Sequence, residues 1–302
     1  MIATVTPNPA VDYTVELSAE PAPGEVFRTD RTRYDAGGKG INVSKYLDAL
    51  GTETLATGFL GGFVGEYLES RLAASELPAS FVDIDGTTRL NTTMLTPEAE
   101  YKINQTGPSV DTPAIESLLG TLRERDPRTV VVAGSLPPGV DTETVDRIAA
   151  AGDWETVVDL NGDVLGELSG EYALCKPNRA ELAESTGRTV DSVESAIEAA
   201  RTLRGRGFSR VVASLGAEGA VLVADDRAFH ASALETDVID TVGAGDALLS
   251  GVLDGFARGE SDQGALRTGV AVATRVVGVS GTRVPSFAEV GSIRDRISVT
   301  SR

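Results

Sequence analysis

The sequence predicts an α/β fold: a central, mostly parallel sheet with helices on both of its faces. Two observations support this prediction. From residue 111 onward, short apolar runs alternate with segments of helical periodicity, which is the rhythm of βαβ units. Some of these runs are almost pure valine, such as Thr129-Val-Val-Val-Ala133, and a strand without polar alternation is typical of a sheet that helices bury on both faces.

The first hundred residues are expected to supply strands, turns and two helices. Residues 2–6 form a β-prone segment that two prolines end, and residues 11–17 alternate between apolar and polar side chains like a strand. Residues 24–34 alternate again after a proline-rich turn, which predicts a half-exposed hairpin. The other elements expected here are helices at about 40–50 and 66–75 and strands at 55–60, 80–84, 90–95 and 101–104.

The rest of the chain is expected to form one continuous series of βα units. The strands expected are 129–133, 156–160, 172–175, 210–214 and 221–223, and the helices are 112–125, 142–151, 191–206, 246–258 and 264–277. Turns after residues 133, 174, 214 and 240 are expected at the carboxyl ends of strands, where α/β sheets bind their ligands. No linker, repeat or low-complexity tract interrupts residues 1–302, so a single domain is predicted.

The composition limits the partners of the chain. Its formal net charge is −18 at pH 7, which argues against nucleic acid and anionic membranes as partners. Only four of its basic residues are lysines: Lys39, Lys45, Lys102 and Lys176. An acidic, lysine-poor surface resists salting-out, which indicates a salt-loving (halophilic) source.

The scarcity of cysteine and histidine excludes further classes of site. A single cysteine, Cys175, cannot form an internal disulfide, which predicts a reducing cytoplasm. A single histidine, His230, excludes histidine-rich metal sites and argues against a Ser-His-Asp triad. Both residues are expected to be structural. No run approaches the roughly 18 apolar residues of a membrane span, and the N-terminus lacks the basic start of a signal peptide.

The segment from Asp240 to Asp246 predicts an anion hole. Thr241, Gly243 and Gly245 indicate a tight turn, and the apolar run that follows indicates a helix. Such a turn exposes backbone N–H groups at the positive end of the helix dipole, which suits a phosphoryl group in transfer. Asp246 would then lie on the first helical turn, placed to accept a proton from an attacking hydroxyl. The alternative is a glycine-rich loop capped by an aspartate.

Two earlier groups of residues are also candidates for binding an anion. Gly37 and Gly38 precede a helix, and Lys39 and Asn42 offer donors there, although the spacing is not that of a Walker A loop. Taken alone, the two glycines favour a structural turn. Arg89 and Lys102, on neighbouring strands, could hold a phosphate between a guanidinium fork and a point charge. The alternative for this pair is two solvated surface charges.

Four short motifs of the chain resemble those of the ribokinase-like, or PfkB, family of carbohydrate kinases and occur in the same order along the sequence. The resemblance runs essentially from end to end. Gly37-Gly-Lys-Gly-Ile-Asn42 is similar to the N-terminal signature of that family, and Asp240-Thr-Val-Gly-Ala-Gly-Asp246 to its C-terminal one. Asn178-Arg-Ala-Glu181 resembles its N-x-x-E element, and Ser214-Leu-Gly-Ala-Glu-Gly219 its nucleotide-binding turn. The resemblance implies a ribokinase-like fold in which a small β-strand lid covers the sugar.

The resemblance also implies a role for each motif. Asp246 would be the catalytic base, beside an anion hole formed by Gly243, Ala244 and Gly245. The residues around the sugar would be Asp12, Gly37, Gly38, Lys39 and Asn42. ATP would lie along Lys176, Asn178, Ser214, Leu215, Gly216, Ala217, Glu218, Gly219, Ala220 and Gly245, with residues 270–283 as the wall of the adenine pocket. Glu181 would hold Mg²⁺, through water.

The lid and Ser135 are expected to determine the substrate. The lid would be formed by segments near 11–34 and 88–105, and such lids often pair to make homodimers in this family. Arg89, Lys102 and Ser135 resemble the branch that acts on phosphorylated hexoses, and a cationic cluster in so acidic a chain fits a dianionic substrate. The resemblance implies fructose 1-phosphate, phosphorylated at O6, as the first choice. Tagatose 6-phosphate and fructose 6-phosphate are the alternatives.

Two other classes of function remain open from the sequence. A non-catalytic sensor of sugar phosphates could use the same scaffold, although Asp246 and its glycine loop argue against it. A dinucleotide-dependent oxidoreductase would require G-x-G-x-x-G after the first strand. In this chain the first strand ends instead in Pro7-Asn-Pro9.

Overall fold

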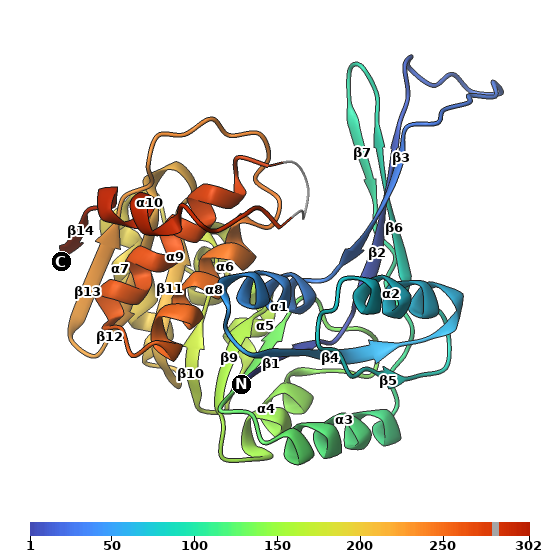
Figure 1. Cartoon of the computed structure of the whole chain (residues 1–302). Coiled ribbons are helices and arrows are strands. Elements are labelled where there is room, and N and C mark those ends of the chain that lie inside the picture. Colours follow the sequence, from blue (N-terminus) through green and yellow to red (C-terminus); the bar gives the residue numbers. More distant parts are fainter. Residues whose placement is uncertain (280–283) are drawn as a thin grey trace.

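The computed structural model of the chain describes residues 1–279 and 284–302 and is built on one large sheet (Figure 1). Among these residues the sheet has ten strands. In spatial order they are β14 (Val299–Ser301), β13 (Arg227–Ala231), β12 (Ala220–Ala224), β11 (Phe208–Ser214), β10 (Tyr172–Cys175), β9 (Glu155–Asp159), β8 (Thr129–Ala133), β1 (Ile2–Thr6), β4 (Thr54–Leu60) and β5 (Val82–Asp83).

The sheet is mostly parallel, as the valine-rich runs predict. The strands from β11 to β5 run parallel to one another, whereas β12, β13 and β14 continue the sheet as antiparallel strands. Strands β13 and β14 and the short helix before β14 were not expected from the sequence. They are short, and an edge hairpin carries little of the continuous apolar pattern that marks a central strand.

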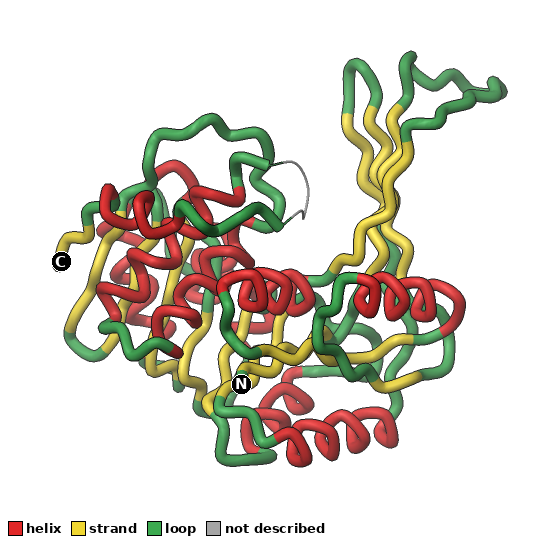
Figure 2. Tube along the Cα trace, viewed as in Figure 1, coloured by secondary structure: helices red, strands yellow, loops and turns green. Residues whose placement is uncertain are grey.

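Helices cover both faces of the sheet, which confirms the predicted architecture (Figure 2). Alternate residues of β8 show this directly, because Val130 and Val132 belong to one buried cluster while Val131 and Ala133 belong to another. The first cluster lies against α3 (Thr112–Arg125), α4 (Thr142–Ala150), α5 (Gly162–Glu167), α6 (Arg179–Thr186) and α7 (Val193–Arg204). The second lies against α1 (Lys39–Leu50), α8 (Ala244–Ala257), α9 (Asp262–Val276) and α10 (Val290–Arg296).

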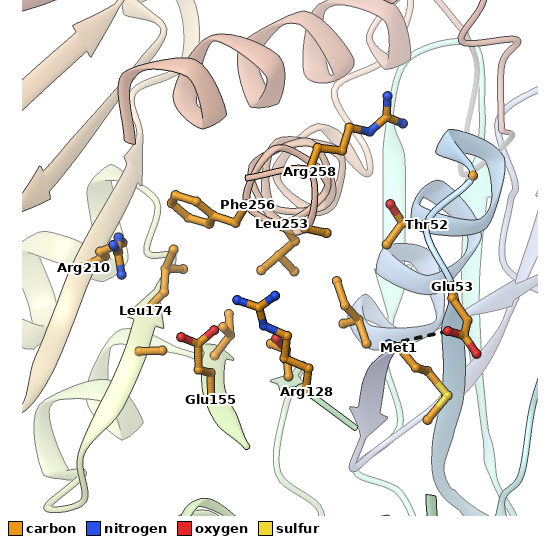
Figure 3. A pocket seen from close by; sticks show the side chains of 16 residues that line it. Met1, Thr52, Glu53, Arg128, Glu155, Leu174, Arg210, Leu253, Phe256 and Arg258 are labelled. Carbon is orange, nitrogen blue, oxygen red and sulfur yellow. Dashed lines mark ion pairs between the residues drawn. The ribbon is translucent and has the colours of Figure 1, made fainter. Parts of the chain in front are cut away.

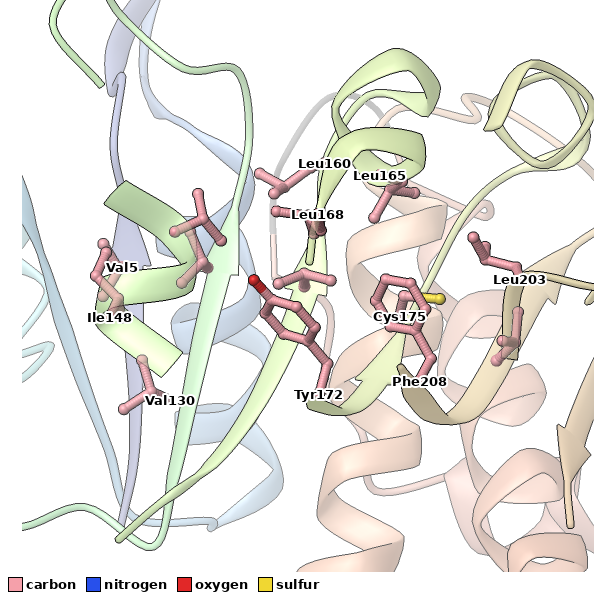
Figure 4. Close-up of a cluster of buried hydrophobic side chains, with 14 of the residues drawn as sticks. Val5, Val130, Ile148, Leu160, Leu165, Leu168, Tyr172, Cys175, Leu203 and Phe208 are labelled. Atoms are coloured by element: carbon pink, nitrogen blue, oxygen red, sulfur yellow. The ribbon is translucent and has the colours of Figure 1, made fainter. Parts of the chain in front are cut away.

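The first cluster packs helices α3 to α7 against the strands whose ends carry the candidate site (Figure 4). Tyr172 and Phe208, on neighbouring strands, stack with ring centroids 5.3 Å apart. The hydroxyl of Tyr172 donates a hydrogen bond to Asp146, so its polar end is satisfied although the ring is buried. Cys175, the sole cysteine, is fully buried in this cluster, in keeping with its predicted structural place.

A second, four-stranded sheet projects away from the body (Figures 1 and 2). Its order is β3 (Thr32–Gly37), β2 (Ala10–Glu16), β6 (Arg89–Leu95) and β7 (Glu100–Ile103), and we call it the lid. Strands β2 and β6 are parallel, and each has an antiparallel neighbour. A third apolar cluster joins the base of the lid to α2 (Gly62–Ala74), through Val11 on β2 and Val64 and Leu68 on the helix.

Three local expectations were wrong. The segment 24–34 is not a hairpin: it is irregular up to residue 31, because Pro21, Pro23 and the charged residues that follow meet no partner strand. The turn before Asp246 does not follow a strand, since residues 232–243 form a loop. Helices α5 and α6 went unpredicted because each is too short to show an amphipathic period.

The packing of α3 gives a first testable prediction. Leu122 is fully buried in the first cluster, so Leu122→Ala removes contacts that the backbone cannot recover by shifting. We expect the free energy of unfolding to fall by about 2–5 kcal/mol. Denaturant titration at fixed KCl would measure it. Leu122→Met, which keeps the volume, should cost less than about 1.5 kcal/mol, and equal losses in the two variants would contradict the packing described here.

Candidate active site

The candidate site lies at the carboxyl ends of the parallel strands, where four charged side chains converge. Asp159 is the last residue of β9, and Lys176 directly follows β10. Lys39 is the first residue of α1, and Asp246 lies on the first turn of α8. Loops and helix N-termini meet at this edge in a parallel α/β sheet, which is why residues 120 and more apart in the sequence become neighbours.

Asp159 is the centre of this cluster. Its side chain is fully buried, with Lys39 Nζ 2.8 Å from Oδ1 and Lys176 Nζ 3.1 Å from Oδ2. Burial alone would raise the pKa of Asp159, but the two lysines outweigh burial and hold the pKa below its usual range. The sequence analysis assigned no role to Asp159. The signal was present, because an acidic side chain ending a valine-rich buried strand needs a cationic partner.

Lys39 also contacts a second carboxylate, that of Glu181. Its Nζ lies 3.6 Å from Glu181 Oε1, in addition to its contact with Asp159. Burial disfavours the charge of Lys39, and the carboxylates of Asp159 and Glu181 outweigh it and raise its pKa. Lys39 therefore stays cationic at every pH of interest and presents fixed positive charge at the strand ends.

Asp246 is buried beside this cluster and is the group best suited to accept a proton. Asn42 Nδ2 donates to its Oδ2 at 2.9 Å. Burial, followed by the negative charge of Asp159, raises the pKa of Asp246 to about 6. A carboxylate with this pKa is ionised at neutral pH and is still basic enough to take a proton from a hydroxyl that is attacking an electrophile.

The start of α8 supplies donors next to Asp246. Gly243 has φ +79°, and a Cβ there would lie 2.6 Å from the hydroxyl of Tyr46, so the turn requires glycine for two reasons. Ala244 N–H donates to Thr241 O at 3.2 Å and closes the turn. Lys176 Nζ lies 3.3 Å from the position of a Cβ on Gly245. The Lys176 amine therefore lies beside the N-terminus of α8, so both sources of positive charge are at the same place.

On the side of the site next to the lid, the described part of the chain contains buried polar atoms without partners. Asp12, on β2, accepts from Asn91 Nδ2 at 3.0 Å, and burial raises its pKa. A Cβ on Gly37 would lie 2.1 Å from Asp12 Oδ2, so only glycine fits against this carboxylate. Within residues 1–279 and 284–302, Thr6 Oγ1, Asn42 Oδ1 and Asn91 Oδ1 are buried oxygens without a hydrogen-bond partner. Hydroxyl groups of a ligand would satisfy such acceptors.

The cationic pair Arg89 and Lys102 is not brought together in this chain. Arg89 lies at the base of the lid, where Nη2 donates to Asn8 O at 2.6 Å. Lys102 is exposed on β7 and pairs with Glu100 at 3.2 Å. Lys102 lies opposite Thr93, four residues along β6 from Arg89, or about 13 Å at the usual rise of a strand.

Ser135 and Arg89 are linked instead through Asn8, a residue for which the sequence analysis predicted no role. Asn8 Nδ2 donates to Ser135 Oγ at 3.2 Å, while the carbonyl of Asn8 accepts from Arg89. The sequence did contain a signal for Asn8, because it is a polar residue between two prolines, directly after a buried strand.

The predicted nucleotide turn joins β11 to β12 through a short 3₁₀ helix, η1 (Gly216–Glu218). Glu218 forms an ion pair with Arg179, and its carbonyl oxygen lies 2.7 Å from a ring nitrogen of His230. Asn178 and Glu181 cap α6 reciprocally: the Asn178 side chain accepts from Glu181 N–H, and the Glu181 carboxylate accepts from Asn178 N–H. Of the predicted adenine wall, residues 270–279 are described, and residues 280–283 lie outside the described residues.

A hollow of about 520 Å³ lies at the opposite edge of the sheet, at the amino ends of β1, β8 and β9 (Figure 3). Its charges are largely satisfied locally, since the Met1 amine pairs with Glu53 at 3.6 Å and Arg258 pairs with Asp254 at 3.0 Å. It contains none of the predicted site residues. Among the described residues, moreover, no three His, Cys, Asp or Glu side chains are grouped so that they could hold a metal ion.

Comparison with known proteins agrees with this geometry. A sequence profile described as pfkB family carbohydrate kinase matches residues 5–288. The chain belongs to the PfkB family of carbohydrate kinases. It is therefore a phosphotransferase with a hydroxyl group as acceptor, and membership implies ATP as the donor. No helix of this PfkB kinase, in the part of the chain that the structure describes, is long and apolar enough to cross a membrane.

Three relatives illustrate the match. The 1-phosphofructokinase of Haloferax volcanii is 50% identical over 301 residues, which cover 100% of this chain and 99% of that protein. The D-tagatose-1-phosphate kinase of Bacillus licheniformis is 36% identical over 256 residues, covering 83% and 84% of the two chains. The crystal structure of phosphofructokinase-2 from Escherichia coli superposes with a TM-score of 0.89 at 28% identity, covering 97% of this chain and 98% of that one.

The environment of Asp246 predicts how activity depends on pH and on this side chain. We expect Asp246→Asn to lower kcat by about 100-fold or more while leaving the KM values for both substrates nearly unchanged, because a general base acts only in the transition state. In the unaltered enzyme, kcat/KM should fall as pH drops through about 6, where Asp246 takes up its proton. Steady-state kinetics from pH 5 to 8 would test this. A variant with normal kcat would rule out the role.

The raised pKa of Asp246 also makes stability depend on pH. Its contribution to stability falls as pH rises, whereas kcat/KM should fall as pH drops. The folded state binds the Asp246 proton more tightly than the unfolded chain does, so this group's contribution to stability is lost as pH rises from 3.8 through about 6. Asp246→Asn should therefore be more stable than the unaltered protein at pH 8, by about 3 kcal/mol, with the difference shrinking towards pH 4. Thermal unfolding at the two pH values would measure it.

Asp159 gives a fourth prediction. Asp159→Asn leaves two lysines without their buried counter-charge, which should lower the free energy of unfolding by about 3–5 kcal/mol. Because Asp159 also raises the pKa of Asp246, the acid limb of kcat/KM should move to lower pH. Asp48→Asn, the same change at an exposed position of α1, is the control and should alter neither property. An unshifted pH profile in an active Asp159→Asn enzyme would contradict this coupling.

Proposed function

We propose that the chain is a 1-phosphofructokinase, which transfers the γ-phosphoryl group of ATP to O6 of fructose 1-phosphate and yields fructose 1,6-bisphosphate. The observation that carries the proposal is the pairing of two ends of one site. A buried base with a raised pKa, Asp246, lies on the first turn of a helix, and a half-buried cation, Arg89, and Ser135 both contact Asn8 at the base of the lid. The Haloferax volcanii relative, 50% identical over its whole length, supports the substrate.

Asp246 would accept the proton of the O6 hydroxyl as that oxygen attacks the phosphoryl group in line. Asn42 holds the carboxylate in one orientation through its 2.9 Å hydrogen bond. The N–H groups at the start of α8 and the Lys176 amine would stabilise the charge that develops on the transferred group. Little covalent chemistry falls to the protein, so positioning and charge neutralisation carry most of the rate.

The residues on the nucleotide side fit ATP and Mg²⁺ in the way proposed from the sequence. The turn at 214–220 and Lys176 would line the ATP groove, and Mg²⁺ held beside them would neutralise charge on the phosphates. One of the two Glu181 oxygens accepts from Asn178 N–H and the other faces Lys39, so Glu181 suits an outer ligand that acts through water. Because Mg²⁺ keeps several waters and takes few carboxylates, this sparse donor set is compatible with it.

The sugar would lie between Asp12 and Asp246. Asp12 and Asn91 offer a carboxylate and an amide oxygen to sugar hydroxyls, and Asn42 offers its free Oδ1. Gly38 and Lys39, at the start of α1, would border the ring. Lid strands β2 and β6 carry Asp12 and Asn91 side by side, so closure of the lid would bring both onto the substrate and exclude water.

A tagatose phosphate is the second candidate. The Bacillus licheniformis relative is named for D-tagatose 1-phosphate, so the proposed alternative keeps the phosphate on C1 and changes only the hydroxyl configuration at C4. Asp12 and Asn91 are the groups that would read that hydroxyl. The tagatose 6-phosphate and fructose 6-phosphate alternatives would require the sugar to be held the other way round. A non-catalytic sensor is a weaker proposal still, because Asp246 and its surroundings are complete.

We also propose that the chain forms a homodimer through the lid and acts in the cytoplasm. The lid exposes large apolar side chains, and Tyr34, Tyr101 and Ile103 are 47%, 45% and 62% exposed. Exposed apolar surface on a sheet with open edges favours burial against a second sheet. The cytoplasmic location rests on the single, buried cysteine.

The test of the proposed function is a comparison of substrates. ATP-dependent turnover would be measured at high KCl with fructose 1-phosphate, tagatose 1-phosphate, fructose 6-phosphate and tagatose 6-phosphate, comparing kcat/KM. The highest value should be that for fructose 1-phosphate. A preference for a 6-phosphate would reverse the proposed orientation of the sugar, and absence of turnover with all four in folded protein would favour the sensor.

Arg89 and Lys102 give a prediction about the sugar phosphate. Arg89→Ala should raise the KM for fructose 1-phosphate about tenfold or more with a smaller change in kcat, because it would remove charge-assisted hydrogen bonds to a phosphate remote from the reacting hydroxyl. Lys102→Ala should raise the same KM less than about threefold, since Lys102 is exposed and already paired with Glu100. Loss of kcat with an unchanged KM would contradict the phosphate role of Arg89.

A further inference from the structure

Asn8 occupies an unusually constrained position at the base of the lid. It lies in the turn between β1 and β2, with Pro7 before it and Pro9 after it. Its side chain is almost completely buried, with 5% of the residue exposed. Each proline fixes its own φ and restricts the residue before it, so the backbone of Asn8 has little freedom. The groups that Asn8 presents are therefore held on a stiff frame.

Asn8 joins three segments that are far apart in the sequence. Its carbonyl oxygen accepts from Arg89 Nη2 at 2.6 Å, at the start of β6. Its Nδ2 donates to Thr106 O at 2.9 Å and to Ser135 Oγ at 3.2 Å. Arg89 also donates to Gln105 O at 3.3 Å. The start of β6, the segment after β7 that contains Thr106, and the turn after β8 therefore all meet at Asn8.

The guanidinium that Asn8 holds is available for an anion. Burial lowers the pKa of Arg89, and Asp12 partly opposes this effect, yet no carboxylate lies within ion-pair distance of Arg89 among the described residues. Two main-chain carbonyls, those of Asn8 and Gln105, orient the group instead. Neutral acceptors fix the direction of a guanidinium without cancelling its charge, which leaves that charge for a ligand.

The amide of Asn8 is oriented at a cost to folding. Thr106 O can only accept, so Nδ2 must face it, and Oδ1 is then buried without a hydrogen-bond partner. Oδ1 lies against Gly107, where a Cβ would be 2.3 Å away. An unpaired buried acceptor destabilises the folded chain. The arrangement is therefore better explained by what it positions than by stability.

We propose that Asn8 is a positioning residue that fixes Arg89 relative to Ser135, and so makes the site select phosphorylated sugars. The inference rests on the proposed function. A phosphate that takes two hydrogen bonds from the Arg89 fork and one from the Ser135 hydroxyl requires the two side chains at a set separation. Asn8 is the residue that contacts both, and it does so from a stiff turn. Without it, each donor would remain, but their spacing would vary.

The test compares Asn8→Ala with a matched amide elsewhere. Gln263 Nε2 donates to Val299 O at the far edge of the sheet, so Gln263→Ala removes a similar hydrogen bond away from the site. For Asn8→Ala we expect the KM for fructose 1-phosphate to rise about tenfold, with kcat reduced less than about threefold and the KM for ATP unchanged. Gln263→Ala should change none of the three. The dissociation constant of fructose 1-phosphate without ATP, by calorimetry, should rise with the KM.

The outcomes separate this inference from the proposed function. A KM for the sugar phosphate within twofold of the unaltered enzyme, or equal losses in kcat and in both KM values, would overturn the role of Asn8. If the unaltered enzyme prefers another hexose phosphate, the substrate proposal fails, and the same comparison with that sugar tests Asn8. If Asn8→Ala does not fold, Asn8→Asp keeps the volume, loses both donors and should raise the KM further by repelling the phosphate.

Discussion

The buried ion pairs of Asp159 are the constraint on which the rest of the site depends. A fully buried carboxylate is tolerated only because Lys39 and Lys176 contact its two oxygens, and those lysines come from two different crossovers of the sheet. The cluster fixes the start of α1 and the end of β10 relative to β9. Burial raises the pKa of Asp246, the charge of Asp159 raises it further, and Asp159 also helps to keep Lys39 cationic. One buried charge thus sets the geometry at the strand ends and contributes to the protonation states there.

The fold makes this arrangement possible because parallel strands end at one edge. The lid carries Asp12 and Asn91 on adjacent strands and is anchored to the body by a small apolar cluster, and in the proposed function these two side chains bind the sugar. In the further inference, Asn8, between β1 and β2, positions the groups that bind the phosphate. In the proposed function, the separate, projecting lid would allow the substrate to enter before closure excludes water.

Much of the fold followed from pattern alone, whereas the roles of the candidate site residues came from the resemblance to the family and stay predictions. Continuous valine strands predicted the parallel sheet, and glycine-rich turns before helices predicted Gly243 and Gly37 as places of close approach. What pattern could not show was which distant residues meet. Asp159 looked like the polar end of a strand until Lys39 and Lys176 were seen on either side of it, and Asn8 looked like part of a turn.

The errors have a common physical origin. The alternation at 24–34 satisfied the period of a strand, but a strand also needs a neighbour, and that segment has none before Thr32. Arg89 and Lys102 lie on two β-strands of the same lid, yet their register separates them along the sheet. Local sequence specifies a strand's period well and its pairing partner poorly, because pairing depends on residues far away.

The central claim is that one substrate spans the site, with its reacting hydroxyl at Asp246 and its phosphate at Arg89 and Ser135. A crystal structure with fructose 1-phosphate and a non-hydrolysable Mg-ATP analogue would test it most directly. The account predicts O6 within hydrogen-bond distance of the Asp246 carboxylate, on the order of 3 Å, and the 1-phosphate between Arg89 and Ser135. A sugar whose phosphate lies instead at the start of α8, with O6 away from Asp246, would contradict it.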